Sequence, residues 1–500
     1  MALEFPDPPI VLQARAHGGR TAVAAPEGEF SYGDLLDASA RVASALLDGA
    51  ADLREAPVAF LAAPGWHYVA TQWGIWRAGG IAVPLAVSHP PAELEYVVQD
   101  ADAPIVVADG AFAEVLRPIA ERNGRRFVAS GDALAADPVV LPGVDEARRA
   151  MIVYTSGTTG KPKGVVTTHA NLRAQVSTLV QAWEWSADDR TLLVLPLHHV
   201  HGIVNVLSCA LWSGAACEIL PRFDADEAWR VIESGRLTLF MAVPTVYNRL
   251  IAAFDQAPAE RQARMAEGCR RMRLMVSGSA ALPVQTLERW RAISGHVLLE
   301  RYGMTEIGMA LSNPLRGERR PGYVGLPLPG VQVRLVDEEG AEVEPGTPGE
   351  VEIRGPTVFL EYWRRPEATA EAFRDGWFRT GDVAVLENGY YRLLGRRSVD
   401  IIKTGGYKVS ALEIEDVLRT HPAIAECAVV GVDDPDWGER ICVAVEGAGV
   451  ALDELQGWAR DHLAPYKLPR DLRRVDALPR NAMGKVMKPE VAKLFSSGGG

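Results

Sequence analysis

The sequence predicts an α/β fold made of a large N-terminal part, a small β-rich subdomain and a smaller α/β C-terminal domain. Short apolar segments alternate with helical ones up to about residue 312, as in a sheet covered by helices on both faces. Apolar and polar residues then alternate as in half-exposed strands, and a second α/β pattern begins near Arg396. Because 500 residues exceed one ordinary core, we predict two domains, 1–395 and 396–500.

A helix of the N-terminal domain is predicted to begin after Ser31. The Ser31 hydroxyl is placed to cap it, with Asp34 three residues on in the position usually held by Glu or Gln. Apolar residues recur behind the cap with helical spacing at Leu35, Leu36, Val42, Leu46 and Leu47. A buried strand is expected at 58–61 and a helix at 66–78. The next short buried strands are expected at 81–85 and 105–107.

The later segments follow the same logic. Alternating residues predict strands at 331–335 and 351–354, which belong to the β-rich subdomain. The C-terminal domain is expected to contain strand 399–403, helix 411–420, strand 425–431 and helix 452–463. Its size of roughly a hundred residues suits an independently folded unit.

Composition excludes several classes of partner. The chain is 48% apolar and 23% charged, as in globular proteins, and its net charge is −12. With no long basic run, we expect no nucleic-acid partner, and any anionic substrate must be held by local charges. No run is apolar and long enough to cross a bilayer, so no membrane partner is expected. Composition does not indicate the oligomeric state.

The cysteines and the N-terminus indicate a cytoplasmic protein. The cysteines have no CxxC spacing and mostly lie in apolar runs, which predicts reduced, buried thiols rather than zinc ligands or disulfides. They are Cys209, Cys217, Cys269, Cys427 and Cys442. The first residues carry acidic Glu4 and Asp7 and show neither a signal-peptide core nor an arginine-rich presequence.

Residues 154–164, Tyr-Thr-Ser-Gly-Thr-Thr-Gly-Lys-Pro-Lys-Gly, predict a phosphate-binding loop. Glycines let backbone N–H groups converge on an anion, hydroxyls donate hydrogen bonds and lysines offset negative charge. The run is not a Walker A loop, which places more residues between its first Gly and the Gly-Lys pair. A flexible surface loop is the alternative. The candidate ATP-binding residues are Thr155, Ser156, Gly157, Thr158, Thr159, Gly160 and Lys161.

Four further motifs follow in order along the chain: 302–306 Tyr-Gly-Met-Thr-Glu, 380–382 Thr-Gly-Asp, 395–396 Gly-Arg and 479–485 Pro-Arg-Asn-Ala-Met-Gly-Lys. Together with the loop they resemble the adenylate-forming superfamily of acyl-CoA synthetases, luciferases and peptide-synthetase adenylation domains. The resemblance spans most of the chain. It implies ATP, Mg²⁺ and coenzyme A as cofactor and co-substrates, and an acid activated as an acyl-adenylate.

The resemblance also implies residue roles. Glu306 matches the magnesium ligand, and Asp382 matches the ribose-binding acid, with Arg396 beside it. Lys485 matches the catalytic lysine that bridges the substrate carboxylate and the phosphate. Taken singly, Glu306 is compatible with a helix N-terminal acid, Asp382 with a turn residue and Lys485 with a surface lysine; the order of the motifs favours the site. Further nucleotide-binding candidates are Tyr302, Gly303 and Thr305.

In the family the small C-terminal domain is mobile and rotates about a hinge before the thiol step. The CoA-binding candidates are Gly405, Gly406 and Tyr407. The hinge segment departs from the family pattern, because one extra residue separates its arginine from the glycine pair. Two alternatives therefore stay open: Ser398 or Val399 is the pivot, and Arg396 or Arg397 meets the ribose.

Two arginines are unexpected in a fatty-acid pocket. Arg301 directly precedes the Tyr-Gly motif, and Arg249 lies about one turn into a helix expected after Pro244. A desolvated guanidinium needs a partner and binds a carboxylate bidentately, so the pair predicts a clamp for a second carboxylate on the acid. The alternative is that Arg301 pairs with Glu300 or Glu306, and that Arg249 is a surface residue.

Neighbouring segments resemble the malonyl-CoA and methylmalonyl-CoA synthetase branch of the family, namely 197–202, 300–306 and 405–413. That resemblance places His199, a catalytic candidate, at the gate between substrate and nucleotide, and Ser279 and His201 at the acyl group. We therefore expect a malonate–CoA ligase that also uses methylmalonate. The alternatives are a short- or medium-chain monocarboxylate–CoA ligase and a nucleotide-binding protein that does not ligate. A histidine metal site is disfavoured, because no cysteine or acidic ligands flank the cluster.

Overall fold

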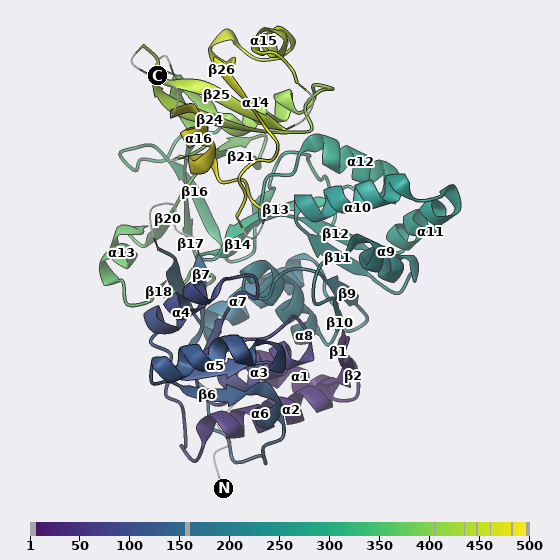
Figure 1. The fold of residues 1–500 in the computed structure, drawn as a ribbon, viewed down its shortest axis with the longest axis vertical. Coiled ribbons are helices and arrows are strands. Elements are labelled where there is room, and N and C mark those ends of the chain that lie inside the picture. The colour runs from purple at the N-terminus through teal and green to yellow at the C-terminus, as the bar shows by residue number, and fades with distance from the viewer. Residues whose placement is uncertain are drawn as a thin grey trace.

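The computed structural model describes residues 7–155, 161–397, 399–404, 407–434, 436–446, 449–460, 462–481 and 484–496. The molecule is elongated, with the C-terminal elements gathered at one end and the N-terminal sheets and helices at the other (Figure 1). Two large sheets form the N-terminal part, a five-stranded sheet follows, and a second five-stranded sheet forms the C-terminal part. The predicted α/β fold is confirmed.

A seven-stranded sheet has the order β18-β8-β7-β4-β3-β5-β6 and is parallel from β7 to β6. Its strands β3, β4 and β5 are buried along their whole length, as expected for parallel strands covered on both faces. The strands are β3 (Pro57–Leu61), β4 (Ile81–Pro84), β5 (Ile105–Ala108), β6 (Arg126–Ala129), β7 (Arg149–Thr155), β8 (Lys163–Thr168) and β18 (Glu361–Tyr362).

A nine-stranded sheet has the order β15-β14-β13-β12-β11-β9-β10-β1-β2, and the pairs from β13 to β1 are parallel. Ligands of such sheets bind beyond the carboxyl ends of the parallel strands. The strands are β1 (Thr21–Ala25), β2 (Gly28–Ser31), β9 (Arg190–Leu193), β10 (Ala216–Ile219), β11 (Leu239–Ala242), β12 (Leu274–Ser277), β13 (Leu299–Met304), β14 (Gly308–Ser312) and β15 (Leu326–Pro327).

Helices cover these sheets. Ser31 caps α2 (Tyr32–Leu47) as predicted, because its Oγ accepts from the Asp34 N–H at 3.1 Å while the Asp34 carboxylate accepts from the Ser31 N–H at 2.8 Å. The other helices of this part are α1 (Pro9–Ala14), η1 (Arg15–His17), α3 (Trp66–Arg77), α4 (Pro91–Asp100), η2 (Gly110–Phe112), α5 (Ala113–Arg122), α6 (Ser130–Leu134), α7 (His169–Ala182), the π-helix η3 (His201–Ser208), α8 (Cys209–Ser213), α9 (Ala225–Glu233), α10 (Pro244–Gln256), α11 (Ala259–Arg270) and α12 (Val284–Ser294).

The β-rich subdomain contains the two predicted strands. Its sheet has the order β16-β17-β20-β19, with β21 paired to β20. The elements are β16 (Gln332–Val336), β17 (Gly349–Arg354), α13 (Pro366–Glu371), β19 (Phe373–Arg374), β20 (Trp377–Glu387) and β21 (Tyr390–Arg396). β20 carries the Thr-Gly-Asp motif and β21 ends on Arg396, so these two strands bring the ribose candidates together.

The C-terminal sheet has the order β23-β22-β25-β24, with β26 paired to β25, and has its own apolar core. The predicted helices and strands are present, whereas β23, β25, β26, η4 and α16 were not anticipated. The elements are β22 (Ile401–Thr404), β23 (Tyr407–Ser410), α14 (Ala411–Leu418), β24 (Glu426–Asp434), β25 (Gly438–Glu446), α15 (Leu452–Arg460), η4 (Pro465–Lys467), β26 (Asp471–Val475) and α16 (Lys488–Ser496). The exact domain boundary stays a prediction.

Two further sequence predictions concern the whole chain. All five cysteines are free and buried, as predicted. Within the described ranges, no helix combines the length and the apolar character needed to cross a bilayer.

Candidate active site

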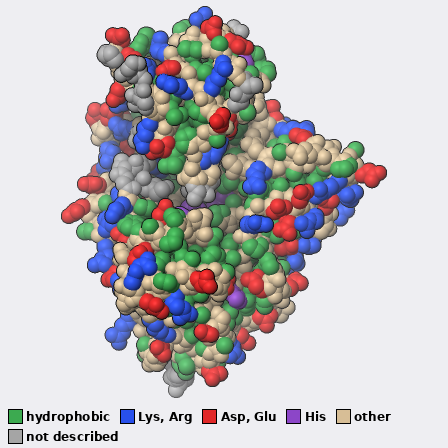
Figure 2. Space-filling view, viewed as in Figure 1, with side chains coloured by type: hydrophobic (Ala, Val, Ile, Leu, Met, Phe, Trp, Pro, Cys, Tyr) green, Lys and Arg blue, Asp and Glu red, His purple; other side chains and the backbone are tan. Residues whose placement is uncertain are grey.

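The predicted acyl-site residues meet at the carboxyl edge of the nine-stranded sheet. His199 and His201 follow β9, Ser279 follows β12, and Arg301 lies on β13. Because the carboxyl ends of parallel strands share one edge, segments far apart in sequence lie together there. This edge faces the C-terminal part of the molecule (Figure 1). In the space-filling view, histidine atoms are visible at mid-height of the face, between the C-terminal part and the body below (Figure 2).

Arg301, Ser279 and His201 form a polar cluster. Arg301 Nη2 donates to Ser279 Oγ at 3.5 Å, and that oxygen lies 3.1 Å from His201 Nδ1. Ser279 has φ 68°, a left-handed conformation that is uncommon outside glycine and often marks functional sites. Arg301 is only 4% exposed, and no carboxylate of the described residues forms an ion pair with it. A buried guanidinium without a counter-charge is suited to binding an anionic ligand.

Glycine and neutral histidine surround this guanidinium. A Cβ on Gly278 would lie 2.4 Å from Arg301 Cζ, so a side chain there would displace the guanidinium. Burial lowers the pKa of Arg301 to about 9, which leaves it charged at neutral pH. Burial, together with the charge of Arg301, lowers the pKa of His201 well below its ordinary value. Arg301 is therefore the cation of the cluster.

Arg249 does not share this environment. Its side chain is exposed on α10, with Cζ 4.8 Å from the centroid of the Phe223 ring. The expectation of two desolvated guanidinium groups is therefore wrong for Arg249. The apolar spacing of the helix already excludes Arg249 from its inward face, which is formed by Val246, Tyr247, Leu250 and Phe254.

The rings of His198 and His199 pack beside one another in the segment that precedes His201. Their ring centroids are 4.2 Å apart, and the ring of His89 lies 6.0 Å from that of His198. Burial, with smaller contributions from the neighbouring histidines, lowers the pKa of His198 to about 3 and of His199 to about 4. Both imidazoles are neutral at neutral pH. The buried Nε2 of His199 has no hydrogen-bond partner among the described residues.

Glu300, the neighbour of Arg301, is buried, and no cation of the described residues forms an ion pair with it. Its Oε1 accepts from the Gly322 N–H at 2.9 Å. Burial raises the pKa of Glu300 to about 8; the Gly322 N–H opposes this shift, and Asp416 adds to it. The folded protein therefore keeps a proton on Glu300 that the unfolded chain releases at lower pH. Glu300 does not neutralise Arg301, which removes one alternative reading of the motif.

Glu300→Gln is expected to stabilise the protein at alkaline pH. The raised pKa of Glu300 means that folding stability falls as pH rises from about 4.5 towards 8. Gln does not ionise, so the free energy of unfolding of the variant relative to wild type should increase by roughly 3 kcal/mol between pH 5 and pH 8. Urea unfolding at the two pH values measures this. Exposed Glu288→Gln is the control, and a pH-independent difference for Glu300→Gln would contradict the prediction.

The next residue on β13 points to the other side of the strand, towards the ribose candidates. Tyr302 Oη donates to Asp382 Oδ2 at 2.6 Å, and Arg396 Nε donates to Asp382 Oδ1 at 3.1 Å. Burial raises the pKa of Asp382, and Arg396 and Tyr302 oppose that shift. Arg397 instead pairs with Glu350 at 3.2 Å. Of the two candidate arginines, Arg396 is thus the one in contact with Asp382.

The candidate magnesium ligand lies close to the phosphate-loop hairpin. Glu306 is 6% exposed, and its Oε1 accepts from Tyr362 Oη at 2.9 Å. Lys163 Nζ lies 5.2 Å from the centroid of the Tyr362 ring. Burial raises the pKa of Glu306. Within the described ranges no group of three or more His, Cys, Asp or Glu is arranged as a metal site.

The phosphate loop joins two paired strands. Thr155 at the end of β7 pairs with Lys163 at the start of β8. Lys161 is exposed, with Nζ 5.4 Å from the centroid of the Tyr96 ring. The candidates Ser156, Gly157, Thr158, Thr159 and Gly160 lie outside the described residues.

The catalytic-lysine candidate extends from a short hairpin of the C-terminal domain. Lys485 is exposed, its N–H donates to Asn481 Oδ1 at 3.0 Å, and Asn481 N–H donates to the Lys485 carbonyl at 2.9 Å. Lys485 is near enough to lower the pKa of Asp382. The lysine and the ribose candidates therefore share one electrostatic environment although they lie about a hundred residues apart in sequence.

The remaining candidates are placed as follows. Gly303 is packed so closely that a Cβ would lie 2.1 Å from the Gly308 carbonyl oxygen, and Thr305 is half-buried. Tyr407 is 53% exposed and stacks on Tyr466 at 4.2 Å between centroids. The candidates Gly405, Gly406 and Ser398 lie outside the described residues.

Comparison with known proteins agrees with this arrangement. Residues 11–363 match the AMP-binding enzyme family, and residues 413–485 match the AMP-binding enzyme C-terminal domain. The chain belongs to the AMP-binding enzyme family. It is 48% identical to a mitochondrial malonate–CoA ligase of Mus musculus, covering 98% of this chain and 91% of that protein. It is 42% identical to a malonate–CoA ligase of Arabidopsis thaliana, covering 96% and 86%.

A solved structure of this family has the same fold over nearly the whole chain. ATP-bound MatB from Rhodopseudomonas palustris matches with a TM-score of 0.91 and 34% identity, covering 98% of this chain and 99% of that one. The match includes the C-terminal part, so both domains take part in the shared architecture.

Sequence reasoning assigned no individual role to two residues of the candidate site. Tyr362, which donates to Glu306, lies outside every motif and reaches the site because β18 pairs with β8 behind the phosphate loop. Gly278 carries no chemistry of its own and is identified only by the space that Arg301 occupies. A lone tyrosine and a lone glycine give no sequence signal for such roles, since both depend on tertiary pairing.

Proposed function

We propose that the chain is an ATP-dependent malonate–CoA ligase that also uses methylmalonate, forming acyl-CoA, AMP and pyrophosphate through an acyl-adenylate. The observation that carries the proposal is the buried guanidinium of Arg301, which lacks a carboxylate partner among the described residues. The relatives named malonate–CoA ligase support it. Arg301 would bind the distal carboxylate of the diacid, with Ser279 and His201 beside it.

Energetics favour a diacid over a monocarboxylate. A fatty acid would leave the buried charge unpaired, and a buried ion pair that lacks one member costs about 3–5 kcal/mol. That difference corresponds to discrimination of roughly a few hundredfold or more. Methylmalonate adds only a methyl group, worth about 1–3 kcal/mol in either direction, and is therefore expected as a second substrate.

In the first half-reaction a carboxylate oxygen attacks the α-phosphorus of ATP. The new oxygen–phosphorus bond forms as the bond to the bridging β-phosphate oxygen breaks, and pyrophosphate leaves with that electron pair. Lys485 would bridge the carboxylate and the α-phosphate, and loop residues 155–161 would hold the outer phosphates. Asp382 and Arg396 would hold the ribose. Lys485 and the loop would act by stabilising accumulated negative charge, whereas Asp382 would act by positioning the nucleotide.

The residues at Glu306 fit a magnesium ion. A buried carboxylate whose pKa is raised by burial gains from a neighbouring cation, and Mg²⁺ normally takes one or two carboxylates and completes its shell with phosphate oxygens and water. When bound, Mg²⁺ would supply charge neutralisation on the phosphates. Tyr302, Gly303 and Thr305 would border the nucleotide on the same segment.

In the second half-reaction the thiolate of CoA attacks the acyl carbon. The carbon–sulfur bond forms, the carbon–oxygen bond to AMP breaks, and AMP leaves. We propose that domain 396–500 rotates between the steps about Ser398 or Val399, removing Lys485 and bringing Gly405, Gly406 and Tyr407 to the pantetheine. His199 would stand between the acyl and nucleotide sites. Backbone without side chains permits the close approach that pantetheine needs.

The proposal is tested by pyrophosphate release with a panel of acids: acetate, butyrate, octanoate, benzoate, malonate, methylmalonate and succinate. Malonate should give the highest kcat/KM, with methylmalonate within about 200-fold of it and monocarboxylates lower still. Highest activity with butyrate or octanoate would overturn the substrate assignment while leaving the ligase chemistry in place.

Arg249→Ala is expected to lower malonate kcat/KM by less than about tenfold, because an exposed cation–π contact is worth only about 0.5–1 kcal/mol. Steady-state kinetics beside Arg301→Ala measures the difference. A loss as large as that of the Arg301 variant would mean that Arg249 turns into the pocket when malonate binds.

The expected location in the cytoplasm stays a prediction, because several relatives of this chain are named mitochondrial.

A further inference from the structure

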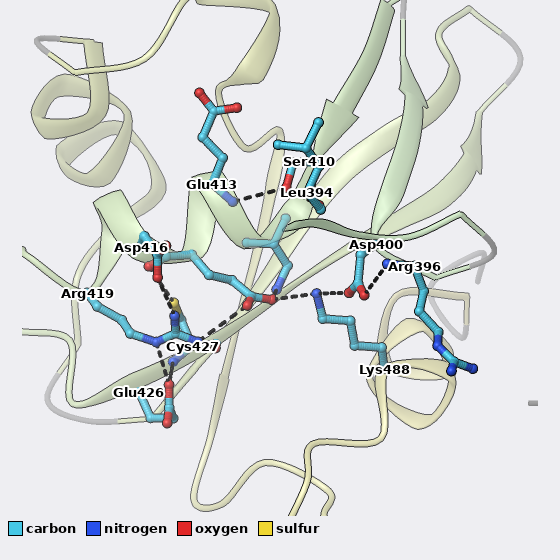
Figure 3. Close-up of polar contacts among 12 residues, drawn as sticks. Leu394, Arg396, Asp400, Ser410, Glu413, Asp416, Arg419, Glu426, Cys427 and Lys488 are labelled. Atoms are coloured by element: carbon cyan, nitrogen blue, oxygen red, sulfur yellow. Dashed lines mark hydrogen bonds and ion pairs between the residues drawn. The ribbon is translucent and has the colours of Figure 1, made fainter. Parts of the chain in front are cut away.

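Lys488 is an unusual residue at its position in the fold. It is the first residue of α16, where the helix dipole disfavours a cation, and it is 9% exposed. Its Nζ forms ion pairs with Asp400 Oδ1 at 2.6 Å and with Glu415 Oε1 at 2.8 Å (Figure 3). Burial lowers the pKa of Lys488, but the two carboxylates outweigh this and raise it above its ordinary value. The lysine is thus held charged between two elements.

The first partner, Asp400, connects Lys488 to the residues of the candidate ribose site. Asp400 Oδ2 accepts from the Arg396 N–H at 2.9 Å, and the Arg396 side chain donates to Asp382 at 3.1 Å. Arg396 precedes the candidate pivots, Ser398 and Val399, and Asp400 follows them. The Asp400 side chain therefore spans the hinge, with Lys488 on its C-terminal side.

The second partner, Glu415, connects Lys488 through further ion pairs to the hairpin that carries Lys485. Glu415 pairs with Arg419 at 3.3 Å, and Arg419 pairs with Glu426 at 2.8 Å (Figure 3). Glu426 pairs with Arg480 at 3.5 Å. A series of ion pairs therefore links Lys488 to Arg480.

Arg480 and Lys488 flank the segment that carries Lys485. Within it, Arg480 and Val486 form a bridge, the Met487 N–H donates to the Pro479 carbonyl at 2.8 Å, and Arg480 Nη1 donates to the Gly484 carbonyl at 2.8 Å. Lys485 itself is exposed. Its position against the nucleotide site therefore depends on how the base of the hairpin is held.

We propose, on the basis of the proposed function, that Lys488 is a positioning residue of the first half-reaction. Through its ion pairs with Asp400 and Glu415 it holds the Lys485 hairpin against the hinge in the arrangement that forms the adenylate. Lys488 touches neither substrate nor nucleotide and acts through Lys485. Loss of its charge would leave the half-buried carboxylate of Asp400 and the buried carboxylate of Glu415 without their shared cation and would move the hairpin.

The test compares the two half-reactions in Lys488→Met, Lys488→Arg and Lys493→Met. Lys493 is the matched control, because it lies on the same helix and forms an exposed ion pair with Glu490. ATP–pyrophosphate exchange with malonate measures the first half-reaction, and thioester formation from supplied malonyl-adenylate and CoA measures the second. Lys488→Met should lower kcat of exchange about 100-fold, the effect of roughly 1 Å of misplacement, with the KM of ATP and the second half-reaction changed by less than about threefold.

Lys488→Arg should recover at least about a tenth of wild-type exchange, because it restores the charge. Lys493→Met should stay within about twofold of wild type. Asp400→Asn removes one partner and leaves Glu415, so it should lower exchange about tenfold with the same selectivity, and the double variant with Lys488→Met should be no worse than Lys488→Met alone. Asp400→Asn and Lys488→Arg also decide the matter if Lys488→Met does not fold.

Equal loss of both half-reactions in Asp400→Asn and Lys488→Met, or no recovery in Lys488→Arg, would overturn the positioning role and leave a structural one. The ratio of half-reactions is measured with whichever acid the wild type activates best. A wrong substrate assignment then appears in the acid panel, and a wrong role for Lys488 appears in the ratio.

Discussion

Arg301→Ala is expected to lower malonate kcat/KM by two to three orders of magnitude. The distal carboxylate would lose its only described cationic partner inside a buried pocket, which costs about 3–5 kcal/mol. Steady-state pyrophosphate release at saturating ATP measures the effect. The KM of ATP should change little, because Asp382 and Arg396 are unaltered.

The stability of the same variant separates binding from folding. In the ligand-free protein the charge of Arg301 is buried without a carboxylate among the described residues, so its removal takes away a desolvated charge. The Tm of Arg301→Ala should therefore not fall below that of wild type by more than a few degrees, while the rise in Tm caused by added malonate should disappear. Unchanged malonate turnover would end the diacid assignment.

Lys485→Ala is expected to abolish adenylate formation selectively. Removing one preorganised group that stabilises developing negative charge costs about 10²–10³ in kcat. ATP–pyrophosphate exchange should fall by at least that factor, whereas conversion of supplied adenylate and CoA to thioester should persist. The exposed position of Lys485 makes a folding defect an improbable source of the loss.

Equal loss of both half-reactions in Lys485→Ala would refute the assigned role of the lysine. The opposite selectivity, with exchange intact and thioester formation lost, would move Lys485 to the second step. Far-ultraviolet circular dichroism and Tm of the variant complete the comparison.

The sequence correctly predicted those helices and strands whose formation depends on residues within one short segment. The Ser31 cap and the apolar strands β3, β4 and β5 form as predicted, because capping and burial act within a few residues. The strand β25 was not anticipated, although its apolar run 441–445 is readable in retrospect, because its neighbours in the sheet come from distant segments.

The residues of the candidate site also differ in how far the sequence predicted their positions. The motifs predicted that Asp382, Arg396 and Lys485 belong to one site, and in the structure these residues lie near one another. The two arginines differ in burial: Arg301 is enclosed, but Arg249 reaches solvent from the polar face of α10, as the apolar spacing of that helix already indicates. The long-range pairing that places Tyr362 on Glu306 leaves no local trace.

The alternation of β13 has a consequence for how such enzymes diversify. Arg301 contacts Ser279 at the candidate acyl site while Tyr302 contacts Asp382 at the candidate ribose site, so adjacent residues of one strand would serve the choice of acid and the binding of ATP. A replacement at the first position can retune which acid enters without disturbing the energy source that activates it. New acid preferences would thus be reachable by single substitutions, with each variant still splitting ATP into AMP and pyrophosphate.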